Sequence, residues 1–321
     1  MFRQLCLITD PNAGGGRAAR FQPAALRQLR QLGFKVRGEV TNGREAAAHA
    51  AAAAAEREEL VVTLGGDGLI GAAAEGIKQN GGGCLAVLPA GRGNDFARAL
   101  GVPLALRSAC ALIREGSPRL LDLGEAGGKV FVSSAYVGFD SKANELANRT
   151  PALLGRFAYA AGALRALGTW KPVSFRVTYK EQPIEGERSR WRTLRERSFR
   201  GFSVVIANTP FYGGGMMVAP TAQPDDGLLE LVTIEQMVRA RFLAHLPTVY
   251  NGGHLRLNEV EWDRCLEATV HADQPIVMYA DGDPIAELPA AVRVLPRAVE
   301  VLAPPHGGRS RKRRLVRLPT P

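Results

Sequence analysis

The sequence predicts an α/β domain built on a parallel sheet, followed by a second, β-rich domain. Three observations support this fold class. Strand and helix patterns alternate four times before residue 115, glycine-rich turns follow three of the strands, and short runs rich in valine and threonine prevail beyond Gly124. The chain of 321 residues also exceeds the size at which a single core usually keeps growing, so two domains are expected.

The first strand, expected at residues 3 to 9, runs into a glycine-rich turn. The loop from Asp10 to Arg17 carries three consecutive glycines, and a helix is expected from there to about Leu32. A strand at 34 to 41 and an alanine-rich helix at 44 to 57 continue the alternation. Because strands joined through helices run in the same direction, the pattern predicts a parallel sheet covered by helices.

The stretch Gly65-Gly66-Asp67-Gly68 follows a fully apolar strand at 60 to 64 and precedes a helix expected from Leu69 to Ile77. Its glycines let the backbone approach a bulky anion, and the helix N-terminus adds positive charge. An aspartate beside phosphate is best explained as the holder of a Mg²⁺ ion, directly or through water. The alternative is an ordinary strand-to-helix turn with Asp67 as N-cap, and these residues alone favour neither.

A third glycine-rich loop, Pro89 to Arg98, follows a strand at 84 to 88, and Asn94 or Asp95 is placed to cap the next helix. The carboxyl ends of parallel strands lie at one edge of a sheet, so all three glycine loops are expected to meet there. Structure alone does not easily explain three such turns. Phosphate binding therefore becomes the favoured interpretation.

The pattern changes beyond a helix expected at 104 to 115. We expect an α/β domain over residues 1–123 and a β-rich domain over 124–306, whose last segment is free to return to the first domain. An amphipathic helix is expected at 152 to 167. The expected strands lie at 118 to 136, 172 to 180, 199 to 208, 227 to 234 and most of 256 to 302.

The net charge of +10 is concentrated at the end of the chain. Residues 307–321 hold six basic side chains and no acid, so this tail is expected to be disordered. Such a tail suits nucleic acid, an anionic membrane or simple solvation.

The cysteines and the hydrophobic segments indicate the cellular compartment in which the protein is expected. Four widely spaced cysteines without a C-x-x-C pair argue against zinc or a disulfide framework and suit a reducing interior. The N-terminus does not resemble a signal peptide, and no uncharged run of about 20 apolar residues occurs. The expected location is cytoplasmic.

Six motifs stand in a fixed order along the chain. They are Pro11-Asn12-Ala13-Gly14-Gly15-Gly16-Arg17, Gly65-Gly66-Asp67-Gly68, Pro89-Ala90-Gly91-Arg92-Gly93-Asn94-Asp95-Phe96-Ala97, Gly138-Phe139-Asp140, Asp225-Asp226-Gly227 and Asp281-Gly282-Asp283. Each motif alone is weak evidence for any one protein family, whereas the six motifs in this order are highly specific evidence. Nearly end to end, the chain resembles the diacylglycerol kinase catalytic-domain superfamily, especially the bacterial soluble lipid kinases related to sphingosine and ceramide kinases.

The resemblance implies an N-terminal α/β nucleotide domain like those of phosphofructokinases and NAD kinases, a C-terminal β-sandwich, and an active site between them. It implies a kinase that uses ATP and Mg²⁺ to phosphorylate a hydroxyl of diacylglycerol or a related lipid. Phosphoryl transfer depends on positioning and neutralised charge, so glycine N–H groups, a metal-holding aspartate and one carboxylate beside the acceptor suffice.

The resemblance also assigns roles to residues. The ATP-binding residues that it implies are Asn12, Thr41, Gly65, Gly66, Asp67, Gly68, Gly71, Gly91, Arg92, Asn94 and Asp95. The catalytic residues that it implies are Asp67, which would organise Mg²⁺, Asp122, which would support the site, and Asp281 and Asp283. A second, structural Mg²⁺ would be held by Asp226 with the backbone carbonyls of Gln223 and Leu228.

The chain departs from the family pattern at three positions. The sequence Asp281-Gly282-Asp283 stands where the family usually has Asp-Gly-Glu, the source of the base, so either aspartate could act. Leu69 and Arg92 replace two threonines expected near phosphate, so ATP binding is expected to be altered, weakened or redirected to another donor. The Arg92 guanidinium either pairs with phosphate oxygens in their place or points to solvent or to Asp95.

Two other hypotheses remain open at this stage. One is an NAD kinase-like enzyme, for which the third loop and the Asp-Asp-Gly turn would be out of place. The other is a non-catalytic nucleotide or lipid sensor. Under the favoured hypothesis the partners are a lipid at the membrane surface and an anionic membrane contacted by the tail, without nucleic acid. The protein would lie at the inner face of the membrane, and a homodimer is left open.

Overall fold

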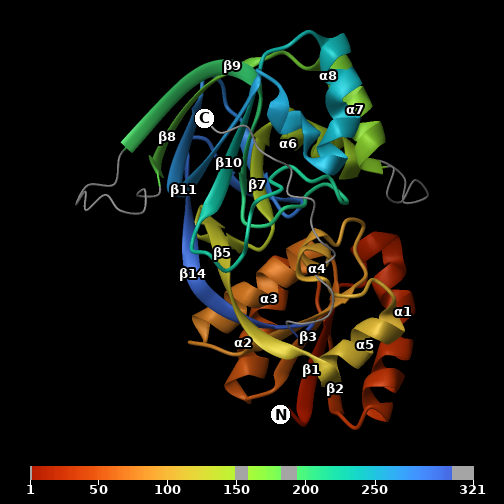
Figure 1. Ribbon diagram of the computed structural model, residues 1–321. Helices are drawn as coiled ribbons and strands as arrows, with labels where there is room; N and C mark the ends of the chain where they lie inside the picture. The colour runs from red at the N-terminus through yellow and green to blue at the C-terminus, as the bar shows by residue number, and fades with distance from the viewer. Residues whose placement is uncertain (1, 149–157, 182–193, 306–321) are drawn as a thin grey trace.

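The computed structural model describes residues 2–148, 158–181 and 194–305. The α/β half lies at one end and the β-rich half at the other, as Figure 1 shows. The basic tail at 307–321 and residues 152–157 of one expected helix lie outside the described residues.

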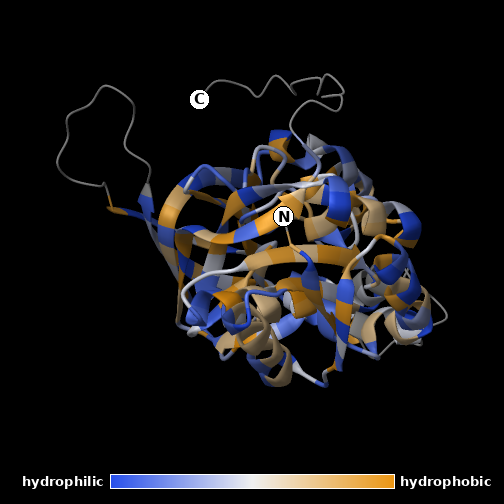
Figure 2. Cartoon of the chain, turned by 90° about the horizontal axis from the view of Figure 1, so that it is seen from below, coloured by the Kyte–Doolittle hydropathy of each residue, from blue (hydrophilic) through white to orange (hydrophobic). Residues whose placement is uncertain are grey.

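The first domain is built on four parallel strands in the order β2-β1-β3-β4. The strands are β1 (Gln4–Thr9), β2 (Lys35–Val40), β3 (Leu60–Gly65) and β4 (Cys84–Pro89). The residues of β3 and β4 are all buried, whereas those of β2, at the edge of the sheet, are half-buried or exposed. Figure 2 views the molecule from this end and shows hydrophobic residues, in orange, gathered along the strands. The predicted parallel sheet is confirmed.

The helices that cover this sheet agree closely with the sequence prediction. They are α1 (Ala13–Gln31), α2 (Arg44–Glu56), α3 (Asp67–Gln79), α4 (Asp95–Leu100) and α5 (Leu106–Glu115). Three of the helices begin at other residues than expected: α1 at Ala13, inside the expected loop, α3 at Asp67 and not at Leu69, and α5 at Leu106. Asp67 is therefore the first residue of a helix, at its positive end.

The second domain is mainly antiparallel. Its strands are β5 (Ser117–Ala126), β6 (Lys129–Phe131), β7 (Ser134–Gly138), β8 (Val173–Glu181), β9 (Leu194–Ala207), β10 (Leu229–Glu235), β11 (Val260–Ala272), β12 (Val277–Ala280), β13 (Asp283–Glu287) and β14 (Ala290–Ala303). The β-rich character expected beyond Gly124 is confirmed.

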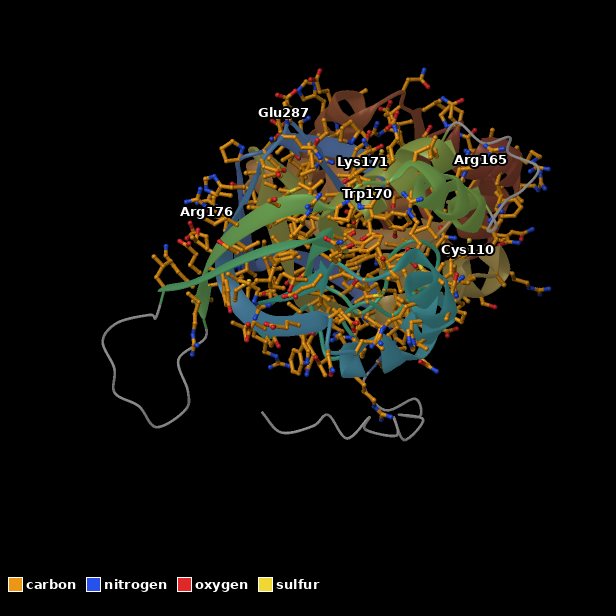
Figure 3. All side chains as sticks on the ribbon, turned by 90° about the horizontal axis from the view of Figure 1, so that it is seen from above. Cys110, Arg165, Trp170, Lys171, Arg176 and Glu287 are labelled. Carbon is orange, nitrogen blue, oxygen red and sulfur yellow. The ribbon has the colours of Figure 1, made fainter. Side chains whose placement is uncertain are left out.

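Helices cover one face of this second domain. They are α6 (Phe139–Asn148), α7 (Ala158–Thr169), α8 (Arg239–His245), η2 (Leu246–Asn251) and η3 (Gly253–Arg256). Of these, only α7 was expected from the sequence. Beneath them the rings of Phe202 and Phe242 stack at 4.5 Å, and Phe139 meets Trp170 edge-on at 6.1 Å. Figure 3, seen from above, places Trp170 and Lys171 just beyond the end of α7. This aromatic core anchors α6, which leads toward the space between the domains.

The long strands β5 and β14 connect the two domains. They pair antiparallel over most of their length, and the end of β14 then pairs parallel with β4, at Glu300 opposite Cys84 and Val301 opposite Leu85. The last described strand thus extends the sheet of the first domain. Because one hydrogen-bonded network runs through both halves, the faces that they turn toward each other are held in a defined relation.

All four cysteines are buried and free. In the described part of the chain, no helix is both long and apolar enough to cross a membrane.

Candidate active site

A cavity of about 480 Å³ lies between the two domains. The first-domain wall comes from the three glycine loops, at Asn12 to Gly14, Gly66 to Leu69 and Gly91 to Gly93. The opposite wall comes from the second domain and includes Ser133, Ser134, Tyr136, Asn144, Tyr212 and the turn at 281–283. The predicted convergence of the three loops at one edge is therefore confirmed.

The glycine loops pack backbone against backbone. A Cβ on Gly14, whose φ is +63°, would lie 2.2 Å from the Ala90 carbonyl oxygen, and one on Gly91 would lie 2.5 Å from the Gly66 Cα. Side chains at these positions would push the loops apart. Glycine thus permits the close approach that gathers backbone groups at one side of the cavity.

Asp67 joins two of these loops. Its carboxylate oxygens accept the backbone N–H groups of Asp95, at 3.0 Å, and Phe96, at 3.1 Å. These N–H groups open α4, so the cap of that helix comes from another loop. Asn94 stands at the N-cap position of α4, as predicted, but its side chain makes no cap hydrogen bond there. Asn94 instead bonds both backbone groups of Gly91 and closes its own turn.

Asp95 joins the two domains. It is buried, and its Oδ2 accepts the backbone N–H of Gly214 at 2.9 Å. Its Oδ1 is buried too and has no hydrogen-bond partner among the described residues. Burial, followed by the charge of Asp67, raises the pKa of Asp95 to about 7, against the N–H donors and Arg98. Burial also raises the pKa of Asp67.

Asp281 and Asp283 differ in what surrounds them. The oxygens of Asp281 accept three consecutive N–H groups, from Val132 at 2.7 Å, Ser133 at 3.0 Å and Ser134 at 3.3 Å. Burial and the charge of Asp67 nevertheless raise the pKa of Asp281 to about 8, although these three donors oppose that shift. The carboxylate of Asp281 is thus already hydrogen-bonded to three backbone N–H groups.

Asp283 is exposed toward the cavity. Its Oδ2 would lie 2.4 Å from a Cβ on Gly68, so the carboxylate stands directly against the central glycine loop. Partial desolvation by the cavity walls raises the pKa of Asp283, and Arg44 opposes the shift. Of the two aspartates in this turn, Asp283 is the more exposed.

The structure brings nine of the predicted site residues to the cavity wall. They are Asn12, Gly66, Asp67, Gly68, Gly91, Arg92, Asp95, Asp281 and Asp283. The other predicted residues do not line it. They are Thr41, Gly65, Gly71, Asn94, Asp122, Gln223, Asp226 and Leu228. Gly71 lies just behind the wall, where a Cβ would be 3.3 Å from Asp281 Oδ2, and the Thr41 hydroxyl is buried without a hydrogen bond.

Asp122 lies at the junction of the domains. Its carboxylate accepts the N–H of Arg297 and of Gly227, each at 2.7 Å. Arg297 has a φ of +50° and sits where the register of β14 against β5 shifts. Asp122 therefore holds the irregular part of β14 and the Asp-Asp-Gly turn together. Its predicted catalytic role remains a prediction.

An arginine side chain lies beside the turn that contains Asp226. The guanidinium of Arg264 approaches Asp226 at 3.8 Å and the buried Glu230 at 3.5 Å. The remaining Asp226 oxygen accepts the N–H of Leu228 at 3.1 Å. A structural Mg²⁺ fits these residues poorly, because a guanidinium already stands beside the only carboxylate of the predicted set. The second Mg²⁺ remains an untested prediction.

The cavity itself suits a Mg²⁺ ion better. Burial raises the pKa of Asp67, Asp95, Asp281 and Asp283, and a cation would relieve the repulsion among these carboxylates. Among the described residues no three His, Cys, Asp or Glu side chains are spaced to hold a metal. Mg²⁺ commonly binds through one or two carboxylates, completed by water and phosphate, so the donor set agrees with that ion.

Several residues of the cavity wall were not predicted. They are Asp10, Ser133, Ser134, Tyr136, Asn144, Tyr212, Gly213 and Gly214. The run of three glycines after Tyr212 was a usable signal, since glycine runs mark the other loops of the site. Ser134 and Tyr136 lie in β7 and Asn144 lies in α6, so these three carry no such signal. Asn144 reaches the site because its amide donates to the Gly282 carbonyl at 2.9 Å.

The fold and the cavity define a class of protein. Glycine loops at the carboxyl edge of a parallel sheet, beside the start of α3, suit the phosphates of a nucleotide, and the carboxylates that face them suit a cation. Residues 4–126 match the family model described as the diacylglycerol kinase catalytic domain, and residues 133–303 match the YegS C-terminal NAD kinase beta sandwich-like domain. The chain belongs to the diacylglycerol kinase catalytic-domain family.

Individual relatives agree with this membership. The chain is 33% identical over 308 residues to a diacylglycerol kinase of Mycobacterium tuberculosis, covering 94% of this chain and 95% of that protein. It is 25% identical to a diacylglycerol kinase of Bacillus subtilis, covering 93% and 95%. A putative diacylglycerol kinase from Bacillus anthracis superposes with a TM-score of 0.72 at 19% identity, over 95% of this chain and 98% of that chain, which shows a shared fold. The predicted family and fold class are confirmed.

Proposed function

We propose that this protein is an ATP-dependent lipid kinase that transfers the γ-phosphate to a hydroxyl of diacylglycerol or a related lipid. The observation that carries the proposal is the placement of Asp67 and Asp283 on opposite walls of one cavity, with Asp283 against Gly68. A phosphate on the glycine loops would then lie next to a free carboxylate. The diacylglycerol kinases among its relatives support the same activity.

In this proposal the first-domain wall binds ATP. The loops at Asn12, Gly66 to Gly68 and Gly91 to Asp95 offer backbone N–H groups and the start of α3 to the phosphates. Asp67 would hold a Mg²⁺ ion, with Asp95 beside it, and that ion would neutralise charge on the transferred phosphoryl group. The bonds from Asp95 and Phe96 fix the Asp67 carboxylate before any ligand arrives.

The second-domain wall would bind the acceptor. Asp283 takes the proton of the lipid hydroxyl as its oxygen attacks the γ-phosphorus, because it is the more exposed of the turn's two aspartates and the carboxylate of the other, Asp281, is engaged by backbone N–H groups. Asp281 holds the turn through its three backbone bonds and so aims Asp283. The carboxylate of Asp283 is one carbon shorter in reach than a glutamate, and its position against Gly68 suits that shorter reach.

We propose further that the protein works at the inner face of a membrane from the cytoplasmic side, where its lipid substrate resides. Residues 307–321, which lie outside the described structure, carry six basic side chains, each worth about 1 kcal/mol near an anionic surface before screening. A chain ending at Gly308 should bind anionic vesicles more weakly and keep its activity on detergent-dispersed lipid. Unchanged vesicle binding would contradict this role for the tail.

The activity is tested by supplying radiolabelled ATP, Mg²⁺ and diacylglycerol in mixed micelles, with NAD⁺ as a competing acceptor in parallel. We expect label in the phosphorylated lipid and none in a dinucleotide. Label in NADP⁺ would favour the NAD kinase-like alternative. ATP binding without transfer to any lipid alcohol, including sphingoid bases, would favour a sensor.

A further inference from the structure

The acceptor wall contains a tyrosine whose role the proposed mechanism does not explain. Tyr136, in the middle of β7, is 5% exposed and lines the cavity. Its ring is held on two sides, by Tyr279 stacked at 6.4 Å and by Tyr212 edge-on at 5.9 Å. The ring is therefore fixed, and its hydroxyl has a defined position at the site.

The Tyr136 hydroxyl has no protein hydrogen-bond partner in the described part of the chain. Most of the Tyr136 side chain is buried, but its hydroxyl oxygen is not among the fully buried atoms that lack a partner, so this oxygen is accessible from the cavity that the residue lines. Tyr212 differs, since its hydroxyl donates to Asp140 at 3.2 Å. The cavity is thus the place where Tyr136 can find a partner.

The surroundings of Tyr136 keep it a neutral donor. Burial raises its pKa, and the charges of Asp281, Asp140, Asp283 and Asp95 raise it further. A phenol that keeps its proton can donate one hydrogen bond into the cavity. The carboxylate of Asp281, its strongest electrostatic neighbour, is already engaged by backbone N–H groups. The natural acceptor is then an oxygen brought by the substrate.

An alcohol between Tyr136 and Asp283 would be oriented by both. Its oxygen would accept from the phenol while its own O–H pointed at the Asp283 carboxylate, which leaves one lone pair of the oxygen for phosphorus. Both side chains belong to the second-domain wall, opposite the glycine loops. Both hydrogen bonds require a free hydroxyl on the substrate. A lipid without one would form neither bond and would bind less tightly.

We propose that the Tyr136 hydroxyl binds the acceptor oxygen and selects lipids that carry a free alcohol. This inference rests on the proposed function, because it takes the second-domain wall as the acceptor side. Tyr136 is a substrate-binding residue in this scheme, and the proton still passes from the alcohol to Asp283.

The test compares Tyr136→Phe with Tyr279→Phe, which removes a hydroxyl from the same aromatic stack at a residue that does not line the cavity. We expect Tyr136→Phe to lower kcat/KM for dioctanoylglycerol by about 10- to 100-fold, as for a hydrogen bond to an oxygen that gains charge in the transition state. The KM for ATP and the melting temperature should stay near those of Tyr279→Phe. Equal kcat/KM in the two variants would overturn the proposal.

A measurement of lipid binding tests, without catalysis, whether Tyr136 recognises the free hydroxyl of the lipid. The parent should bind dioctanoylglycerol roughly 5-fold more tightly than the matching diester of propane-1,2-diol, which lacks only the free hydroxyl. Tyr136→Phe should reduce this preference to the part that Asp283 supplies. If the parent phosphorylates no lipid, the proposed function fails, yet this comparison still tests Tyr136. A preference that is unchanged in Tyr136→Phe, or a parent that shows none, would refute the role of Tyr136.

Discussion

The carboxylate of Asp95, on the third glycine loop, accepts the backbone N–H of Gly214, in the second domain, at 2.9 Å. This bond crosses the cavity between the domains, and the glycine turn that contains Gly214 is closed by paired bonds between Tyr212 and Met216. Asp95 therefore connects the first-domain wall of the cavity to the second-domain wall through a carboxyl group whose pKa is raised to about 7.

The first prediction follows from the pKa of Asp95, which is raised from 3.8 to about 7. The folded protein binds a proton there more tightly than the unfolded chain, so this contribution to stability is complete below about pH 4 and is lost as pH rises through about 7. In EDTA, Asp95→Asn should flatten the fall in melting temperature between pH 5 and 8. Asp273→Asn, an exposed aspartate away from the cavity, should leave the fall unchanged. An identical pH profile for Asp95→Asn and the parent would contradict the assignment.

The second prediction concerns Asp67. Asp67→Asn removes the charge that would hold Mg²⁺ at nearly unchanged volume, so transfer should be abolished while the fold persists. Because an amide can accept only one of the two α4 bonds well, a stability change of about 1 kcal/mol is expected beside the loss of activity. Activity is measured as kcat and the fold by circular dichroism. A variant with the kcat of the parent would exclude Asp67 from catalysis.

The third prediction separates the two aspartates of the 281–283 turn. Asp283→Asn should lose on the order of 10² to 10⁴ in kcat without loss of stability, as expected for a general base. Asp281→Asn should be destabilised by about 1–3 kcal/mol, because its side chain accepts three N–H groups and an amide cannot satisfy them all. Urea unfolding and steady-state kinetics on both variants distinguish the roles. Small, equal losses of kcat would place the base elsewhere.

The fourth prediction concerns Asp122. Its buried carboxylate satisfies the N–H groups of Gly227 and Arg297, so Asp122→Ala should lower the free energy of unfolding by about 1–3 kcal/mol for each donor left unpaired. Asn208→Ala serves as the comparison, since it loses the amide bonds to the carbonyls of Asp122 and Val132 but leaves the Asp122 carboxylate and its two N–H donors in place. If Asp122→Ala kept full stability and lost kcat, the catalytic role implied by the resemblance would be restored.

The fifth prediction concerns Arg92, which lines the cavity where a threonine was expected. If its guanidinium pairs with phosphate, Arg92→Ala should weaken ATP binding by about 1.5–3 kcal/mol, as for a hydrogen bond to a charged group, and Arg92→Thr should recover part of it. Isothermal titration with a non-hydrolysable ATP analogue measures this. Equal affinity in Arg92→Ala and the parent would show that Arg92 does not compensate for the missing threonines.

The sequence by itself determined the architecture and the edge at which the site forms. Strand and helix periods are local properties, and glycines mark turns that only they can form, so the parallel sheet and its three converging loops were predictable. The helices α6 and α8 were not, because short helices over a buried aromatic cluster leave little periodic signal, and their stability comes from packing against Phe139, Phe202 and Phe242.

Only the tertiary structure decided which aspartate carboxylate accepts a hydrogen bond from which backbone N–H group. Asp67 caps a helix 28 residues further along the chain, and Asp122 bonds Arg297 across 175 residues. The sequence left Asp281 and Asp283 equivalent, whereas the structure engages the first with backbone and exposes the second to the cavity. Such pairings depend on the packing of distant segments, and burial, which sets each pKa, exists only once those segments have met.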